Sequence, residues 1–319
     1  PTTTDACLLT GRLSAKNFDN EVDLESVRRA VREKVGDAFG MTAEEAAMSI
    51  IRVADSNMFN ALKLISVRRG YDPRDFAMVA FGGGGPMHCA YLARELNVRK
   101  VIVPVAASVF SAWGMLMTDL RHDYIQTKIC RMNEVALSEL NAMWDGLVSQ
   151  ARAQFAQEGV PDGRIVYSFI ADMRYMGQEH TVKVHVPPVP WTDEVKAEIV
   201  ARFHETHEHF YTYRLPDTPT EIVNLHLVAY GRLQKPELHR IDPQRGPVSG
   251  AVKETRPVYF TDEGWQDTPI YDREKLGAGA AVSGPAIVEE VTASTVVCPG
   301  QSLTVDGYGN LIIETEVRE

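Results

Sequence analysis

The sequence predicts a mixed α/β protein in two parts: an α/β layer in residues 1–132 and a β-rich α+β region in residues 133–319. Two observations carry this prediction. Between residues 75 and 120, short apolar runs alternate with helical patterns, as expected of a sheet covered by helices. Beyond residue 211, apolar runs separated by Gly, Pro and Asp turns indicate β-strands with little helix.

The first part contains a long helical pattern. Small and apolar residues recur with a period of 3.6 from residue 43 to residue 65. Thr42 and Glu45 match a capping box at the start of this helix, and Gly70 marks its end. The elements expected next are a buried strand at 75–81, a helix at 86–96, a buried strand at 100–105 and a helix at 108–120. This alternation predicts the α/β layer.

The second part begins with a long amphipathic helix at 133–159. A Pro-rich segment, "VPPVPWTDE", precedes a further helix at 193–211. Strands are expected at 164–176, 180–186, 221–233, 256–260, 268–271, 284–300, 301–307 and 310–317. The change of pattern places the boundary between the two parts somewhere in residues 130–165.

Composition narrows the possible partners. The 319 residues include 45% hydrophobic and 24% charged side chains, enough for a large core. A formal net charge of -10 offers no basic field for nucleic acid or an anionic membrane. The four cysteines lack CxxC spacing, and the sequence shows neither a signal peptide nor a long apolar span, so a cytoplasmic location is expected. The start "PTTTDACLLTG" reads like the middle of a domain, so we expect a piece of a longer protein.

A glycine-rich turn lies between the strand at 75–81 and the next helix. It contains four consecutive glycines: Gly82, Gly83, Gly84 and Gly85. Such a turn lets backbone N–H groups approach a phosphate or nucleoside, and the helix N-terminus adds partial positive charge. Pro86 is well placed as the first helical residue, and His88 could reach a bound ligand or pack against the neighbouring strand. The pattern is neither a P-loop nor a dinucleotide fingerprint, and a tight turn that needs positive φ is the alternative.

Acidic and imidazole side chains suggest two further sites. Asp119, His122 and Asp123, in "TDLRHDY", lie where a helix passes into a strand. They could orient Mg²⁺-bound water or act as general acid and base; polar caps at a helix end are the alternative. Asp5, in "TTTDA", could bind a metal or the substrate, or cap a loop.

Two histidines three residues apart superficially suggest a metal-binding helix. His204 and His207 lie in "RFHETHEHFYTYR", but the spacing is one residue short of HExxH. We therefore favour a solvent-exposed helix face for these histidines. The repeat of Phe203, His207 and Tyr211 at every fourth position indicates packing rather than metal binding.

Several segments of the chain resemble a known protein family. The segment "DPRDFAMVAFGGGGPMHCAYLARELNVRKVIVPVAASVFSAWGMLMTDLRHDY" resembles the second half of the ATP-dependent hydantoinase A and 5-oxoprolinase family, which also includes subunits of ketone carboxylases. Further matches are "PTTTDACLLTGRL", "DMRYMGQEHTVKV" and "GPAIVEEVTASTVVCPGQSLTVDGYGNLII". The resemblance implies the second lobe of an actin-like, Hsp70-like ATPase fold, followed by a β-rich C-terminal region. It also implies that the glycine turn faces ATP, with Mg²⁺ nearby, and that Gln178 on a hairpin contacts the substrate.

The resemblance also implies a function. ATP would phosphorylate the carbonyl oxygen of a cyclic amide, as in a hydantoinase or 5-oxoprolinase, so that the ring can be hydrolysed. A ketone carboxylase subunit and a non-catalytic assembly module are the alternatives. The family's Asp-Gly-Gly-Thr turns, which grip phosphate and Mg²⁺, are absent from this sequence. The expected partners are therefore an N-terminal ATPase half of the same protein, a hydantoinase B-like subunit and a small-molecule substrate.

Overall fold

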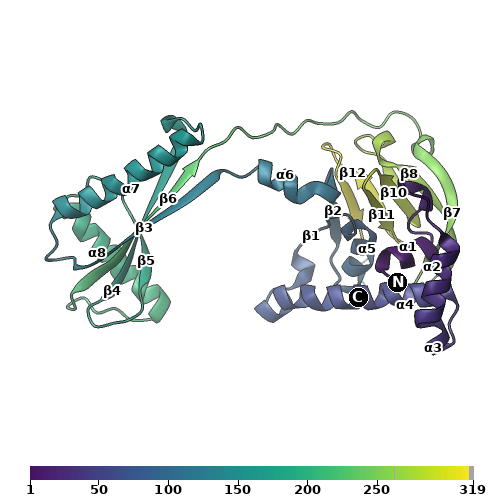
Figure 1. Ribbon diagram of the computed structural model, residues 1–319, viewed down its shortest axis with the longest axis horizontal. Helices are drawn as coiled ribbons and strands as arrows, with labels where there is room; N and C mark the ends of the chain where they lie inside the picture. Colours follow the sequence, from purple (N-terminus) through teal and green to yellow (C-terminus); the bar gives the residue numbers. More distant parts are fainter. Residues whose placement is uncertain (262, 316–319) are drawn as a thin grey trace. The chain divides into compact units, whose positions relative to one another are not determined.

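The computed structural model describes residues 1–261 and 263–315. The chain folds into two compact units, and each is described by itself (Figure 1). Unit 1 combines Pro1–Met115 with Glu237–Glu319, whereas unit 2 is the continuous segment Leu116–Pro236.

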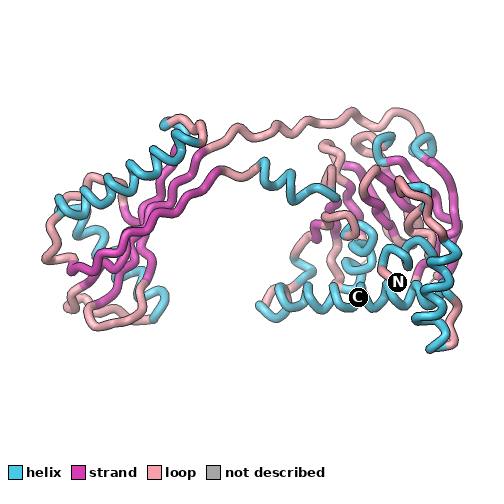
Figure 2. The backbone as a smooth tube through the Cα atoms, in the orientation of Figure 1, coloured by secondary structure: helices cyan, strands magenta, loops and turns pink. Residues whose placement is uncertain are grey.

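Both units mix helices with strands (Figure 2). The first segment of unit 1 contains α1 (Thr3–Leu9), α2 (Leu24–Val31), α3 (Asp37–Phe39), α4 (Ala43–Ile65), β1 (Met78–Val79), α5 (Gly85–Glu95), β2 (Lys100–Val103) and α6 (Phe110–Leu116), whose last residue opens unit 2. Unit 2 contains β3 (Leu120–Arg131), α7 (Leu137–Gln157), β4 (Ile165–Tyr175), β5 (Val182–Val186), α8 (Asp193–Tyr211) and β6 (Thr220–Gly231). The second segment of unit 1 contains β7 (Val252–Phe260), β8 (Gly264–Asp272), β9 (Ala281–Ser283), β10 (Ala286–Glu290), β11 (Ala293–Val297), β12 (Ser302–Val305) and β13 (Leu311–Glu314).

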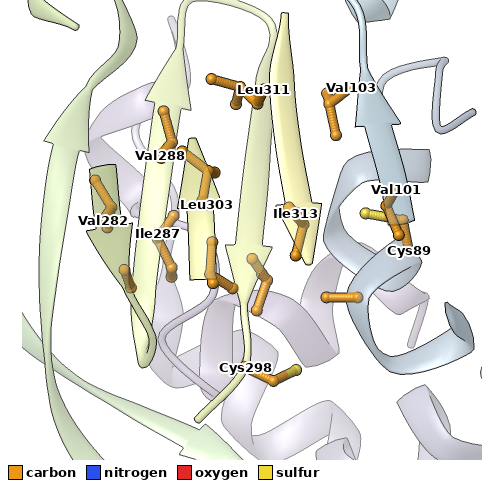
Figure 3. Packing of buried hydrophobic residues seen from close by; sticks show 14 of the residues in the cluster. Cys89, Val101, Val103, Val282, Ile287, Val288, Cys298, Leu303, Leu311 and Ile313 are labelled. Carbon is orange, nitrogen blue, oxygen red and sulfur yellow. The ribbon is translucent and has the colours of Figure 1, made fainter. Parts of the chain in front are cut away.

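Unit 1 is built on two sheets. The first has the strand order β1-β2-β13-β12-β9, with β1 and β2 parallel and β13 antiparallel to β2. The second has the order β11-β10-β8-β7. One continuous core joins the sheets to α5, and Figure 3 shows Val101, Leu303 and Ile313 in it beside Cys89 and Cys298. The last strand of the chain therefore completes the sheet that β1 and β2 begin.

A second core in unit 1 lies between its N-terminal helices. Small and apolar side chains of α1, α2 and α4 bury one another there, among them Ala6, Val31 and Ile51. The predicted capping box of α4 is confirmed, since Thr42 and Glu45 exchange hydrogen bonds between their side chains and backbone N–H groups. This interaction satisfies two backbone donors that the first helical turn leaves free.

Unit 2 is an antiparallel sheet with helices packed on its core. The strand order is β3-β6-β4-β5, and Trp144 and Phe155 of α7 share one hydrophobic core with Phe203 of α8 and the inner side chains of the sheet. The expected hairpin at residues 164–186 is confirmed by the pairing of β4 with β5. Gly177 in its turn has a φ of 86°, a backbone conformation that favours glycine.

The division into units differs from the two ranges expected from the sequence, 1–132 and 133–319. β3 pairs along its length with β6, so residues 116–132 belong with unit 2. Glu237–Glu319 return to unit 1, where β13 pairs with β2. A change of pattern along the chain reports local composition, whereas strand pairing between distant segments decides which unit a residue joins.

Several expected elements are shorter in the structure. The buried strand expected at 75–81 is β1, which has only two residues, Met78 and Val79; the first is half-buried and the second exposed. The helix expected at 108–120 is α6, and Leu120 already belongs to β3. The strand expected at 310–317 is β13; residues 316 and 317 lie outside the described residues. Within the described part of the chain, no helix combines the length and the apolar character needed to cross a membrane.

Candidate functional site

The glycine turn lies at the edge of the first sheet of unit 1 where β1 and β2 end. These two strands are parallel, so the loops that follow them meet at the same edge. The backbone N–H of Gly82 donates to the carbonyl oxygen of Ala107 at 2.8 Å, which fixes the start of the turn against the loop after β2. The edge beyond the carboxyl ends of parallel strands is where open α/β sheets bind ligands.

Only one of the four glycines has a backbone conformation that favours glycine. Gly82 has a φ of 82°, whereas Gly83, Gly84 and Gly85 have no positive φ. A Cβ added at Gly83, Gly84 or Gly85 would meet no heavy atom closer than 3.8 Å, an ordinary contact distance. The turn itself therefore requires glycine at position 82 alone. The three following glycines leave open space beside the backbone without a structural need for it.

The turn leads directly into α5. This helix begins at Gly85, one residue before Pro86, which was predicted to be its first residue. Gly84 at the N-cap supplies no side-chain hydrogen bond to the helix. The backbone N–H groups of the first helical turn therefore lack a side-chain acceptor. Together with the partial positive charge of the helix N-terminus, they suit an anionic group.

His88 is buried beneath the turn and paired with an acid. Its Nδ1 lies 2.6 Å from Oδ1 of Asp55 on α4, and the two side chains are 8% and 2% exposed. His88 also lines a cavity of about 290 Å³ together with Phe81 and Gly85. His88 therefore packs inside the unit, with its hydrogen bond to α4, and it also borders a cavity at the turn; its contact with a ligand stays a prediction. Asp55 was not among the predicted site residues, although an acid on the apolar face of a helix is a usable signal.

Exposed aromatic rings flank the glycine turn. Phe81 is 49% exposed, and its ring centroid lies 5.5 Å from that of Phe110 on α6. Phe110 stacks on Trp113 at 5.3 Å. No residue of α6 is buried, although its sequence, "FSAWGML", is mostly apolar. The turn is therefore bordered by an apolar surface as well as by backbone donors.

A larger pocket of about 680 Å³ opens beside the loop after β2. The hydroxyl oxygens of Ser108 and Thr292 lie 2.5 Å apart at its lining. Arg273 donates to Glu290 at 2.9 Å and to the carbonyl oxygens of Val103, Pro104 and Gly309. This buried guanidinium ties the loop after β2 to the turn between β12 and β13, so the edge of the sheet has a fixed shape.

Asp119, His122 and Asp123 all lie in unit 2, and the structure gives each a partner of its own. Asp119 accepts from Lys235 Nζ at 2.6 Å and from the backbone N–H of Leu233 at 3.1 Å. The hydrogen bond from Lys235 is the main reason that the pKa of Asp119 lies below its ordinary value. Asp119 thereby ties the segment that enters unit 2 to the segment that leaves it.

His122 and Asp123 are consecutive residues of β3, so their side chains point to opposite faces of the sheet. His122 Nε2 lies 2.9 Å from Glu158 Oε1, whereas Asp123 accepts from Arg121 at 2.8 Å and pairs with His226 at 2.8 Å. The hydrogen bond from Arg121, reinforced by the one from His226, lowers the pKa of Asp123 to about 2. The acid, imidazole and second acid therefore do not converge on one point.

Two more predicted site residues serve as local structural contacts. Asp5 completes a capping box of α1 by accepting from the backbone N–H of Thr2 at 2.7 Å. Gln178 lies in the β4–β5 turn, with its amide 3.2 Å from Tyr213 Oη and 3.3 Å from His207 Nε2. In the described part of the chain, no group of three or more His, Cys, Asp or Glu side chains could hold a metal ion.

The solvent-exposed face expected for the histidines of α8 is wrong for His207, which is 2% exposed. Its ring packs between Phe203 and Tyr211, as the four-residue spacing predicted, and hydrogen-bonds the carbonyl oxygen of Tyr213 at 3.0 Å. His204 pairs with Tyr175 Oη at 2.7 Å. The segment 212–215, which folds back on the helix, covers a face that the helical pattern alone presents as polar.

The chain resembles known proteins over nearly its whole length. An uncharacterised protein of Methanocaldococcus jannaschii is 36% identical over 98% of this chain and 44% of its own length. Caprolactamase subunit alpha of Pseudomonas jessenii is 30% identical over 96% of this chain and 45% of its own length. A nucleotide-free structure of acetone carboxylase matches with a TM-score of 0.90 at 25% identity, covering 98% of this chain and 46% of that chain. This chain thus spans less than half the length of these relatives.

Two family models divide the chain between them. The model described as hydantoinase/oxoprolinase matches residues 1–124, and the model of the hydantoinase/oxoprolinase C-terminal domain matches residues 130–314. The boundary between the matches falls within β3, near the boundary expected from the sequence. The resemblance found in the glycine turn and the later motifs is confirmed, and the chain belongs to the hydantoinase/oxoprolinase family.

Proposed function

We propose that this chain is the C-terminal part of an ATP-dependent enzyme that opens a cyclic amide after phosphorylating its carbonyl oxygen. One observation carries the proposal: Gly83, Gly84 and Gly85 leave open space at a parallel-strand edge although only Gly82 requires glycine for its backbone. A nucleotide can approach the backbone closely only where side chains leave space, and the fold itself does not require the space beside these three glycines. In this proposal, unit 1 contributes the second lobe of an actin-like, Hsp70-like ATPase fold.

The residues present fit the nucleotide. The backbone of Gly83, Gly84 and Gly85, with the first turn of α5, would hold its phosphates or ribose, and His88 borders the same turn. Amide resonance makes an unactivated lactam hard to open, and the phosphoryl group that bound ATP would supply to the carbonyl oxygen removes this resonance. Water would then add to the carbonyl carbon, the C–N bond would break as the ring nitrogen leaves with a proton, and a second water would release the phosphate from the acyl group. The chain's own share is to position the ligand and to stabilise charge with backbone donors.

The residues present do not fit Mg²⁺ by themselves. Asp5, the predicted metal ligand, is occupied by the cap of α1, and the described residues contain no cluster of three or more candidate ligands. We therefore assign the Mg²⁺ ligands and the phosphate-gripping turns to an N-terminal ATPase half of the same protein. A hydantoinase B-like subunit and a small-molecule substrate complete the proposed assembly, which we place in the cytoplasm.

A second candidate is a subunit of an ATP-dependent ketone carboxylase. It is supported by the TM-score of 0.90 to acetone carboxylase, whereas the higher sequence identity to caprolactamase subunit alpha supports the cyclic amide. Both candidates use the same first step, phosphorylation of a carbonyl or enol oxygen. They differ in the step that follows: water attacks the activated carbonyl carbon of the amide, whereas the enol carbon of the activated ketone attacks the carbon of a carboxyl donor.

The test is ATP turnover by the full-length protein together with its partner subunit. Phosphate release is measured with a saturated lactam, 5-oxoproline, a hydantoin, and a ketone with bicarbonate, each against a reaction without substrate. We expect stimulation by at least one cyclic amide. Stimulation by the ketone with bicarbonate alone would establish the carboxylase instead. Calorimetric titration that shows no binding of a non-hydrolysable ATP analogue would leave an assembly module as the function.

A further inference from the structure

The glycine turn has few contacts that hold it in place. Four successive residues lack side chains, so the backbone between Gly82 and Gly85 has unusual conformational freedom. Its start is fixed by the hydrogen bond from Gly82 N–H to the carbonyl oxygen of Ala107 at 2.8 Å. Its end runs into the first turn of α5. A site built on such a turn binds well only if both ends are held, because ordering a flexible loop costs binding free energy.

The end of the turn is held by a buried pair. His88, three residues after Gly85, lies 2.6 Å from Asp55 through its Nδ1, and Asp55 belongs to a different helix, α4. Asp55 is 1% exposed, and a carboxylate so deeply buried is rare without a partner. The contact therefore ties the first turn of α5 to the middle of α4.

The same contact decides how the imidazole of His88 is presented. When Asp55 accepts this hydrogen bond, Nδ1 of His88 is the ring nitrogen that carries the proton, because carboxylate oxygens only accept. Nε2 is then the ring nitrogen left for a ligand, and in the neutral ring it is an acceptor. His88 lines the cavity of about 290 Å³ beside Phe81 and Gly85, whose other walls are mostly apolar. Within this cavity, a ligand group with an N–H or O–H donor is the chemistry that Nε2 would bind.

We propose that Asp55 is a positioning residue of the glycine-turn site: through His88 it fixes the first turn of α5 and leaves Nε2 facing the ligand. The inference rests on the proposed function, because it assigns the ligand of the turn to a nucleotide. Asp55 does not touch that ligand, and its whole effect passes through His88.

The test compares variants in the full-length protein. Asp55→Ala removes the acceptor, and we expect a loss of about tenfold in affinity for a non-hydrolysable ATP analogue, equivalent to about 1.4 kcal/mol. Asp55→Asn retains an oxygen acceptor and should recover most of this affinity. Met48→Ala is the matched control, since Met48 is buried on the same helix in a separate core and its loss should lower the melting temperature without changing affinity.

Two further measurements separate positioning from general stability. The first is NMR of ¹⁵N-histidine-labelled protein, in which the signals that disappear in His88→Ala identify this ring. Nδ1 of His88 should carry the proton in wild type and in Asp55→Asn. In Asp55→Ala, Nδ1 should no longer be the main site of the proton. In protein that already carries His88→Ala, adding Asp55→Ala should cause no further loss of affinity, because Asp55 acts on the ligand only through the His88 side chain.

Each other outcome overturns the inference. Wild-type affinity in Asp55→Ala, with only a lower melting temperature, would make the pair a fold contact. An additional loss in the double variant would mean that Asp55 acts by another route. If the wild-type protein binds no nucleotide at all, both the proposed function and this inference are wrong. If wild type binds the analogue and Asp55→Ala binds it equally well, only this inference is wrong.

Discussion

Gly82 and Gly84 lie two residues apart in one turn, yet substitution should affect them in opposite ways. Gly84 has a φ of -95°, and a Cβ there meets only the flexible end of Met87, at 3.8 Å. Gly84→Ala should therefore leave the melting temperature unchanged or slightly raised, because alanine reduces the freedom of the unfolded chain. If a nucleotide approaches this backbone, the same methyl group should cost at least about tenfold in affinity, or about 1.4 kcal/mol. Calorimetric titration of full-length protein measures this affinity.

Gly82→Ala is the matched comparison for this prediction. Its φ of 82° strains any residue with a Cβ, although no atom lies within 4 Å of that position. We expect a loss of about 1 kcal/mol of folding stability and little loss of affinity in the folded fraction. Wild-type affinity in Gly84→Ala would mean that the open space beside the turn does not serve a ligand.

Asp123 makes the stability of unit 2 depend on pH in an acid range. Its pKa falls from 3.8 to about 2 in the folded protein, chiefly because of the hydrogen bond from Arg121 and secondarily because of His226. A depressed folded-state pKa stabilises the protein above the unfolded value, and this contribution is lost as pH falls through the folded value. The melting temperature of unit 2 should therefore fall less between about pH 4 and about pH 2 in Asp123→Asn than in wild type. An identical pH profile in both proteins would contradict the prediction.

A control for this profile is Asp145→Asn, an exposed carboxylate on α7 of the same unit. It should leave the dependence on pH as in wild type. The comparison also bears on Asp123 as a catalytic residue, which remains a prediction from the sequence. If Asp123→Asn changes only the dependence of stability on pH and leaves turnover unchanged, Asp123 serves the fold of unit 2.

Local residue roles were predictable where the partner lies nearby in sequence, and not otherwise. The capping box of Thr42 and Glu45 was predicted because the two residues are three positions apart. Asp55 was missed because its partner, His88, is 33 positions away on another helix. His207 was misplaced for a different reason: Tyr213 is only six positions away, but the helical pattern does not predict that the segment after α8 folds back over the helix.

At the scale of elements, β13 holds unit 1 together across the length of the chain. It lies between β2 and β12, and Ile313 is fully buried in the core that includes Val101 and Leu303 (Figure 3). Ile313→Ala should cost about 2–5 kcal/mol of unit 1 stability, from lost burial and the cavity that remains. Denaturant unfolding followed by the fluorescence of Trp265, which lies in unit 1, measures this cost.

Glu314, the exposed neighbour of Ile313 on the same strand, provides the control. Glu314→Ala should change stability by no more than about 0.5 kcal/mol. Equal effects of the two substitutions would show that β13 does not belong to the core sheet. The expected strand at 310–317 was predictable from an apolar run that follows turn residues, but its position beside β2 was not, because strand order depends on contacts between distant segments.

At the scale of the whole molecule, the continuous segment of unit 2 interrupts unit 1 along the sequence, so that unit 1 consists of two segments. Every strand pair of β3, β4, β5 and β6 lies inside residues 116–236, and so does one complete hydrophobic core. Unit 1 instead needs both of its segments, because β13 and β12 complete the sheet of β1 and β2. The sequence predicted the order of most elements but not this interruption, which periodicity alone does not encode.

Unit 2 should therefore fold without unit 1. We expect residues 116–236, produced alone, to fold cooperatively, with Trp144 and Trp191 buried from solvent as they are in the chain. In the full-length protein, Phe203→Ala should destabilise unit 2 by about 3–5 kcal/mol, because its fully buried ring belongs to that core alone. Differential scanning calorimetry should show one transition moved to lower temperature, while the transition of unit 1 and the affinity for an ATP analogue stay unchanged. A single transition that shifts as a whole, or an unfolded segment 116–236, would mean that the two units fold only together.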